Sequence, residues 1–113
     1  MNFHLKRGVS CVGVRPELLI GLMIAESVWH DHSISGGLVI TSLTDGRGIH
    51  RDGSLHFVGL GADLRTNPAL QGGVPMSVLP DLVRRLRSEL GDEWDVIQHS
   101  THMHIEYQLK RKE

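Results

Sequence analysis

The sequence predicts a small α+β domain in which an antiparallel sheet packs on helices, with residues 1–113 forming one unit. The length of 113 residues supports one hydrophobic core and leaves no room for a second domain. Two segments with helical character are separated by short segments with strand character, which is the order of an α+β fold. The single cysteine, Cys11, cannot close an intramolecular disulfide, so core packing must hold the fold together.

Two helices are expected, over residues 16–30 and 77–90. Pro16 suits the first turn of the first helix, and the turn-rich stretch after it closes at Gly36 and Gly37. The second segment has apolar residues at helical spacing, namely Val78, Leu79, Leu82, Val83, Leu86 and Leu90. Gly91 follows the last of these and is expected to end the helix.

Four short segments are expected to be strands. Residues 38–43 (LVITSL) are β-branched and apolar, and residues 61–66 (GADLRT) follow a glycine-rich loop. Residues 93–98 (EWDVIQ) and 102–109 (HMHIEYQL) come after the second helix and supply the third and fourth strands. The chain therefore runs helix, strand, strand, helix, strand, strand.

The charge balance excludes two classes of partner. Lys and Arg total 12 against 13 Asp and Glu, so the net charge of the chain does not attract nucleic acid or an anionic membrane.

The apolar run 18–25 is too short to span a bilayer and lacks a small-residue cleavage site. We therefore expect a protein made in the cytoplasm without a signal peptide, which another factor must release if it acts outside the cell.

One stretch, SLHFVGLGADL at residues 54–64, is typical of a functional site rather than a regular strand. It places His56 and Asp63 seven positions apart, which on a regular strand would put the two side chains on opposite faces. Gly59 and Gly61 lie between them and would permit the chain to bend. With that bend, an imidazole and a carboxylate could face one point.

A second stretch, HSTHMHIEY at residues 99–107, contains three histidines in six positions. On a strand, His102, His104 and Glu106 share one face, while Met103 and Ile105 face the other. Imidazole and carboxylate are the usual nitrogen and oxygen ligands of zinc, and a catalytic zinc site uses three of them and leaves a fourth position for water. One histidine of the His-x-His pair could therefore complete a ligand set begun by the first stretch.

Together the two stretches resemble the zinc D-alanyl-D-alanine carboxypeptidases and related peptidoglycan peptidases, whose fold is shared with the Hedgehog amino-terminal domain. The first stretch resembles the family pattern Ser-x-His-x-x-Gly-x-(Gly/Ala)-Ala-x-Asp, and HMHIEY resembles its closing His-x-His strand. The resemblance implies that His56, Asp63 and His104 bind zinc. It also implies hydrolysis of a peptide bond, with zinc activating a water molecule and polarising the carbonyl.

The resemblance also suggests where the general base lies. Many members of the family carry a carboxylate three residues before the last zinc-binding histidine, or a glutamate slightly farther upstream. This chain has Thr101 and His99 at those places. The penicillin-insensitive murein endopeptidases instead use His-x-x-His-x-His, which His99, His102 and His104 reproduce. We therefore assign the role of base or transition-state stabiliser to His102, with His99 as its helper.

The implied partner is a peptidoglycan peptide. The family commonly places an arginine upstream of the first motif to bind a substrate carboxylate or stabilise the oxyanion, and Arg47 and Arg51 lie in that loop. Ser54 could orient a zinc ligand or form a turn. The bond cut could be D-Ala-D-Ala, L-Ala-D-Glu or a cross-bridge. A phage or prophage lysin core, released through a holin, fits these features, and a bacterial peptidase is the alternative.

Three other interpretations stay open. The chain could be an inactive, zinc-stabilised module of a phage particle or secretion apparatus, which the missing carboxylate before His104 favours. The three proposed ligands could form a hydrogen-bonded structural cluster. A His-hydrophobic-His DNA endonuclease would need a tyrosine aimed at the metal, but Tyr107 is expected on the opposite face of the strand from His104.

The remaining candidates have ordinary interpretations. Glu106 and Asp95 are expected to face water, and Trp29 and Trp94 to be core or rim aromatics. The other histidines lack a ligand-like partner at fixed spacing and are interpreted as surface residues, namely His4, His30, His32 and His50.

Overall fold

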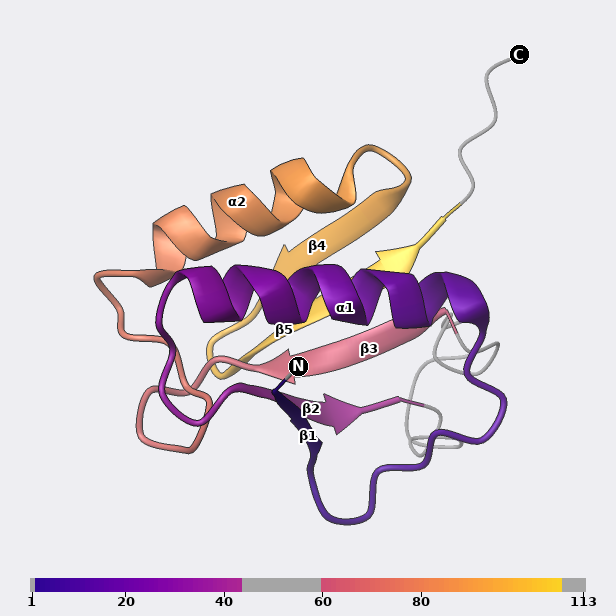
Figure 1. The fold of residues 1–113 in the computed structure, drawn as a ribbon, viewed down its shortest axis with the longest axis horizontal. Coiled ribbons are helices and arrows are strands. Elements are labelled where there is room, and N and C mark those ends of the chain that lie inside the picture. The colour runs from indigo at the N-terminus through magenta and orange to yellow at the C-terminus, as the bar shows by residue number, and fades with distance from the viewer. Residues whose placement is uncertain (1, 44–59, 109–113) are drawn as a thin grey trace.

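A five-stranded sheet with two helices on one face forms the fold in the computed structural model, which describes residues 2–43 and 60–108 (Figure 1). In chain order the elements are β1 (Phe3–Leu5), α1 (Pro16–Asp31), β2 (Leu38–Ser42), β3 (Gly61–Arg65), α2 (Leu79–Leu90), β4 (Trp94–Gln98) and β5 (His102–Tyr107). The strands lie in the order β1-β2-β3-β5-β4. The predicted α+β class, both helices and the four predicted strands are confirmed.

The prediction of an antiparallel sheet is wrong at one edge. β1 pairs parallel with β2, whereas the other neighbouring strands pair antiparallel, so the sheet is mixed. The physical reason is the connection: α1 lies between β1 and β2 in the chain and carries it back, as a parallel pair requires. The backbone N–H of Lys6 donates to the carbonyl of Ile40 at 2.9 Å and extends this pairing past the end of β1.

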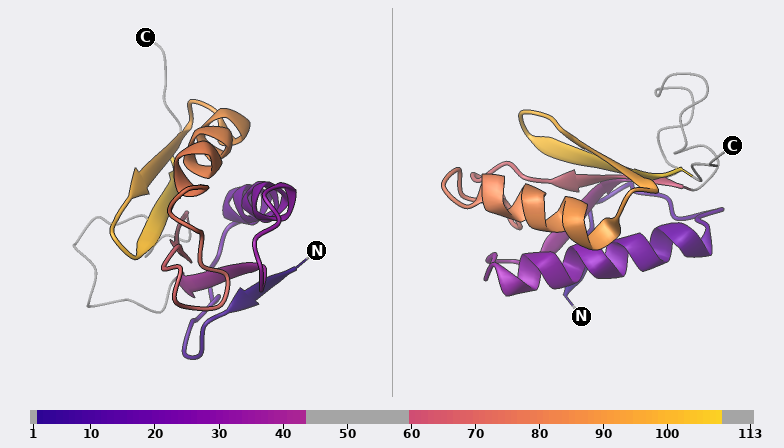
Figure 2. Two further views of the ribbon diagram at one scale, coloured as in Figure 1. Left: turned by 90° about the vertical axis from the view of Figure 1, so that its left-hand side faces the viewer. Right: turned by 90° about the horizontal axis from the view of Figure 1, so that it is seen from above.

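The hydrophobic core lies between the helices and one face of the sheet. Figure 2 shows α1 and α2 side by side on that face. The fully buried side chains of the two central strands β3 and β5 point into this layer, and so do those of the helices. These core residues include Leu18, Trp29, Leu82 and Leu86 from the helices and Ala62, Leu64, Met103 and Ile105 from the strands. The alternate residues of β3 and β5 therefore lie on the face away from the helices.

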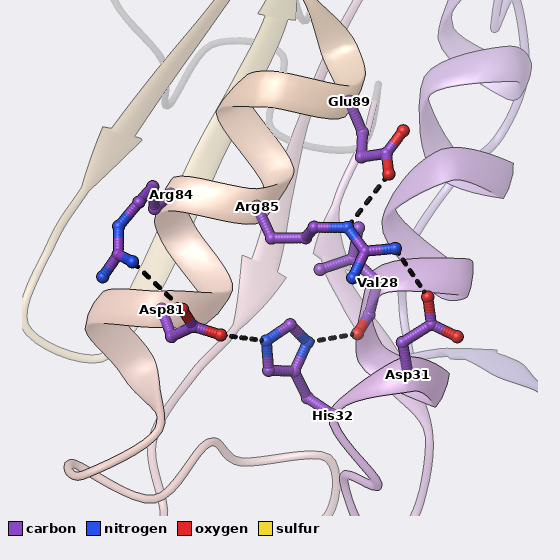
Figure 3. Close-up of polar contacts among 7 residues, drawn as sticks. All are labelled: Val28, Asp31, His32, Asp81, Arg84, Arg85 and Glu89. Atoms are coloured by element: carbon purple, nitrogen blue, oxygen red, sulfur yellow. Dashed lines mark hydrogen bonds and ion pairs between the residues drawn. The ribbon is translucent and has the colours of Figure 1, made fainter.

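Polar side chains join the C-terminal end of α1 to α2 (Figure 3). One ring nitrogen of His32, Nδ1, donates to the carbonyl of Val28 at 2.8 Å, and the other, Nε2, lies 2.9 Å from the carboxylate of Asp81. Arg85 of α2 reaches back to Asp31 at 2.8 Å. The bond to Val28 and the bond and charge of Asp81 raise the pKa of His32. His32 is therefore not an ordinary surface histidine: its side chain is 11% exposed and bridges two helices.

The connection between β3 and α2 is also tied to α1. The indole N–H of Trp29, which is buried as expected, donates to the carbonyl of Gly72 at 3.2 Å. A Cβ atom added to Gly73 would lie 1.9 Å from the carbonyl oxygen of Asn67, so the chain there passes too close to itself for any side chain.

None of the helices within residues 2–43 and 60–108 has the length and apolar character needed to cross a membrane.

Candidate functional site

The predicted site residues divide between the described and undescribed parts of the chain. Asp63 lies in β3, His102 and His104 lie in β5, and His99 lies in the turn between β4 and β5. Four other predicted site residues lie outside the described residues, namely Arg47, Arg51, Ser54 and His56. The structure therefore describes two of the three predicted zinc ligands and both candidate bases.

Asp63 and His104 lie directly opposite each other on adjacent strands. They are register partners in the antiparallel β3–β5 pair, and Nδ1 of His104 is 2.9 Å from Oδ1 of Asp63. Both side chains are largely covered, with 16% of Asp63 and 14% of His104 exposed. Two of the three predicted zinc ligands, 41 positions apart in sequence, are thus in direct contact.

The sheet fixes this contact through its alternation. Ala62, Leu64, Met103 and Ile105 point into the core, so the residues between them must point away from the helices. On the other side of β3, the register shifts between Ile40 and Ser42 of β2, which indicates a β-bulge beside Asp63.

Glu106 is a third member of this cluster. Its Oε1 lies 2.8 Å from Nε2 of His104, and the side-chain amide of Gln108 contacts its other oxygen. Only 17% of the Glu106 side chain is exposed, so the expectation that it faces water is wrong. Its position was already implied by the sequence, because His102, His104 and Glu106 are two residues apart and therefore share one strand face.

The cluster is arranged to hold positive charge. Both ring nitrogens of His104 face carboxylates, and only an imidazolium can donate to two acceptors at once. Burial lowers the pKa of His104, but the hydrogen bonds and charges of Asp63 and Glu106 outweigh burial and raise it. Two carboxylates therefore converge on a single cation.

Asp63 and His104 have the donor chemistry that zinc requires, since a carboxylate oxygen and an imidazole nitrogen are both ordinary zinc ligands. Within residues 2–43 and 60–108, no group of three or more His, Cys, Asp or Glu side chains is arranged to hold a metal ion. The third predicted ligand, His56, is among the residues that the structure does not describe.

The two candidate bases are in contact with each other. The rings of His99 and His102 stack, with centroids 4.6 Å apart and planes inclined by 22°. The backbone N–H of His99 donates to the carbonyl of His102 at 2.9 Å and closes the turn into β5. His102 lies two residues from His104, and so on the same strand face, about 6.7 Å away along the strand.

A hollow of about 350 Å³ adjoins the cluster on the face away from the helices. It is lined by Lys6, Thr41, Ser42, Asp63, Arg65, Asn67, Leu70, Thr101 and His102. Two of these residues, Lys6 and Arg65, are cations that sequence reasoning did not select. Arg65 could have been found, because it lies two residues after Asp63 on the same strand, whereas Lys6 is brought to the hollow only by the pairing of β1.

Comparison with known proteins adds no identification. No protein-family model, curated protein or solved structure matches this chain. Membership of the zinc peptidase family therefore stays a prediction, supported by the two sequence motifs and by the placement of Asp63, His102 and His104.

Proposed function

We propose that this protein hydrolyses peptide bonds in peptidoglycan stem peptides or cross-links, using zinc bound by His56, Asp63 and His104. The observation that carries the proposal is the direct pairing of Asp63 with His104, at 2.9 Å, on the sheet face away from the helices. The resemblance of the two motifs to zinc peptidases selects the same two residues. The cell wall would be the place of action, after release by another factor of phage or bacterial origin.

Asp63 and His104 suit zinc because a carboxylate oxygen and a ring nitrogen converge at 2.9 Å, and a zinc ion could replace the proton between them. A zinc ion there would supply Lewis acidity and lower the pKa of a water molecule. Asp63 would contribute a carboxylate oxygen and His104 one ring nitrogen, while His56 would complete the three-ligand set. Glu106 would hold the other nitrogen of His104, as carboxylates commonly do behind a metal-binding histidine, and would fix the orientation of the ring.

His102 would take and return the proton. It lies on the same strand face as His104 and lines the hollow beside Asp63, so its imidazole faces the space that a substrate would enter. Neutral imidazole is a base suited to neutral pH. The stacked ring of His99 would restrict the orientation of His102, which is a positioning role.

The test combines zinc analysis with peptidoglycan cleavage. The purified full-length protein is expected to contain one zinc per chain and to release amino groups from purified peptidoglycan in a chelator-sensitive reaction. Asp63→Asn removes the ligand charge with little change in volume and should lose both zinc and cleavage. The matched control is Asp92→Asn, at an exposed turn before β4, which should keep both. Full cleavage by a zinc-free protein would refute the proposal.

A second candidate function is a zinc-stabilised module without catalysis. The observation that favours it is Thr101, which stands where many of the peptidases carry a carboxylate and whose carbonyl accepts hydrogen bonds from Thr66 and Asn67. This candidate predicts one zinc per chain with no cleavage. It also predicts that zinc removal lowers the unfolding midpoint, while His102→Ala leaves zinc content unchanged.

A further inference from the structure

We propose that the hollow beside Asp63 is a carboxylate-binding subsite in which Lys6 and Arg65 neutralise an anionic group of the substrate peptide. Its cations are different residues from the loop arginines that the family resemblance suggests, because Lys6 follows β1 and Arg65 ends β3. As a subsite for catalysis it rests on the proposed function. Its capacity to bind a carboxylate does not, and can be measured separately.

The charges in the hollow favour an anion. Its lining contains the cations of Lys6 and Arg65 and the single carboxylate of Asp63, which is turned toward His104. Across residues 2–43 and 60–108, neither Lys6 nor Arg65 forms a salt bridge with a carboxylate; Nη1 of Arg65 donates to the carbonyl of Gln71 at 3.3 Å. The remaining guanidinium donors suit the planar geometry of a carboxylate.

The position of the two cations is set by the backbone. Arg65 is the register partner of His102 and lies two residues after Asp63 on β3. It is therefore on the same sheet face as Asp63 and His104. Lys6 is held beside β2 by its backbone bond to Ile40. Asn67, which also lines the hollow, adds a side-chain amide that can donate hydrogen bonds, whereas the hydroxyl of Thr41 donates to the carbonyl of Asp63 at 3.4 Å.

The size of the hollow indicates a small ligand group. A volume of about 350 Å³ is at the lower end of the range for small-molecule sites and suits one or two residues of a peptide. The carboxylate could be the C-terminus of the peptide or an acidic side chain within it. In either case it would lie next to Asp63, and hence next to the bond to be cut.

The test measures binding with three peptides and chelator-treated, full-length protein. The probes are N-acetyl-D-alanyl-D-alanine, its C-terminal amide, and N-acetyl-L-alanyl-D-glutamate α-amide, whose only carboxylate is on the side chain. Dissociation constants come from the backbone amide NMR signals of Asn67 and Thr101. One of the two carboxylate peptides should bind about tenfold more tightly than the uncharged amide, and which one does identifies the source of the carboxylate.

Charge-neutralising variants test the residues. Arg65→Gln and Lys6→Gln should each remove most of this preference, while binding of the uncharged amide stays unchanged. The matched controls are Arg84→Gln on α2 and Arg7→Gln beside Lys6, which make the same change of charge outside the hollow and should keep the preference. Equal binding of acid and amide peptides by the wild type, or a preference that survives both hollow variants, overturns the proposal.

Two failures remain distinguishable in this design. A carboxylate preference in a protein that cleaves no peptidoglycan would overturn the proposed function and leave the anion subsite standing. Chelator-sensitive cleavage without a carboxylate preference would support the proposed function and overturn the anion subsite. With an active protein, Arg65→Gln should raise KM for the preferred peptide more than it lowers kcat.

Discussion

Replacement of His32 tests the bridge between the two helices. Its ring bonds to the carbonyl of Val28, which also accepts the backbone N–H of His32 at 3.2 Å, and to Asp81 in the first turn of α2. The pKa of His32 is raised above its ordinary value of 6.5 by the bond to Val28 and then by Asp81. Its stabilising effect is therefore complete below pH 6.5 and declines as the pH rises through the higher, folded-state pKa.

The magnitude follows from the number of hydrogen bonds that the ring can donate. Above the folded-state pKa the neutral ring has a single N–H and can donate to Val28 or to Asp81 but not to both. One bond worth about 1 kcal/mol is then lost. The Asp81 side chain is 64% exposed, so solvent screens the accompanying charge interaction. We expect the destabilisation caused by His32→Ala to be about 1 kcal/mol larger near pH 5.5 than near pH 9.

The assay is urea unfolding of the wild type and two variants at both pH values. His30→Ala is the matched control, since His30 is exposed and lies in the same last turn of α1. Differences in helix propensity cancel when each variant is compared with itself at the two pH values. The same pH dependence for both variants would refute the bridge, as would a larger effect of His32→Ala near pH 9.

Two packing predictions concern the connection between β3 and α2. Gly73→Ala should lower the free energy of unfolding by about 1–3 kcal/mol, because the new Cβ atom would meet the Asn67 carbonyl at 1.9 Å; an unchanged thermal midpoint would contradict this. Trp29→Phe should cost about 1–3 kcal/mol, since it removes the bond to Gly72 and leaves unfilled volume in the core. Urea unfolding at neutral pH measures both, and a neutral Trp29→Phe would show that the indole bond contributes nothing.

Both helices and four strands could be predicted from the sequence: α2 from the helical spacing of its apolar residues, α1 from Pro16 and the glycines after it, and β2 from its β-branched apolar run. β1 could not, since its three residues are all exposed and show no pattern of burial. β1 is a strand because the outer edge of β2 is available for pairing and α1 returns the chain to that edge. Neither condition can be read from the three residues of β1 themselves.

The candidate site was predictable where its chemistry repeats along one strand and not where it depends on distant contacts. Alternation placed His102, His104 and Glu106 on one face, although the environment of Glu106 was misjudged. The role of His32 was missed because its partner Asp81 is 49 residues away in sequence. Lys6 was missed for the same kind of reason, since only the parallel pairing of β1 carries it to the hollow.

The core and the candidate site depend on a single strand register. A slip of one residue between β3 and β5 would expose Leu64 or Met103 and bury Asp63 or His104 among the helices. Each exposed apolar side chain would cost roughly 1.5–3 kcal/mol, and each buried charge would cost more. The packing of Leu64 and Met103 therefore enforces the contact between Asp63 and His104, whichever cation the cluster holds. For that reason Asp63→Asn, which keeps the volume and the register, should separate loss of zinc from loss of the fold.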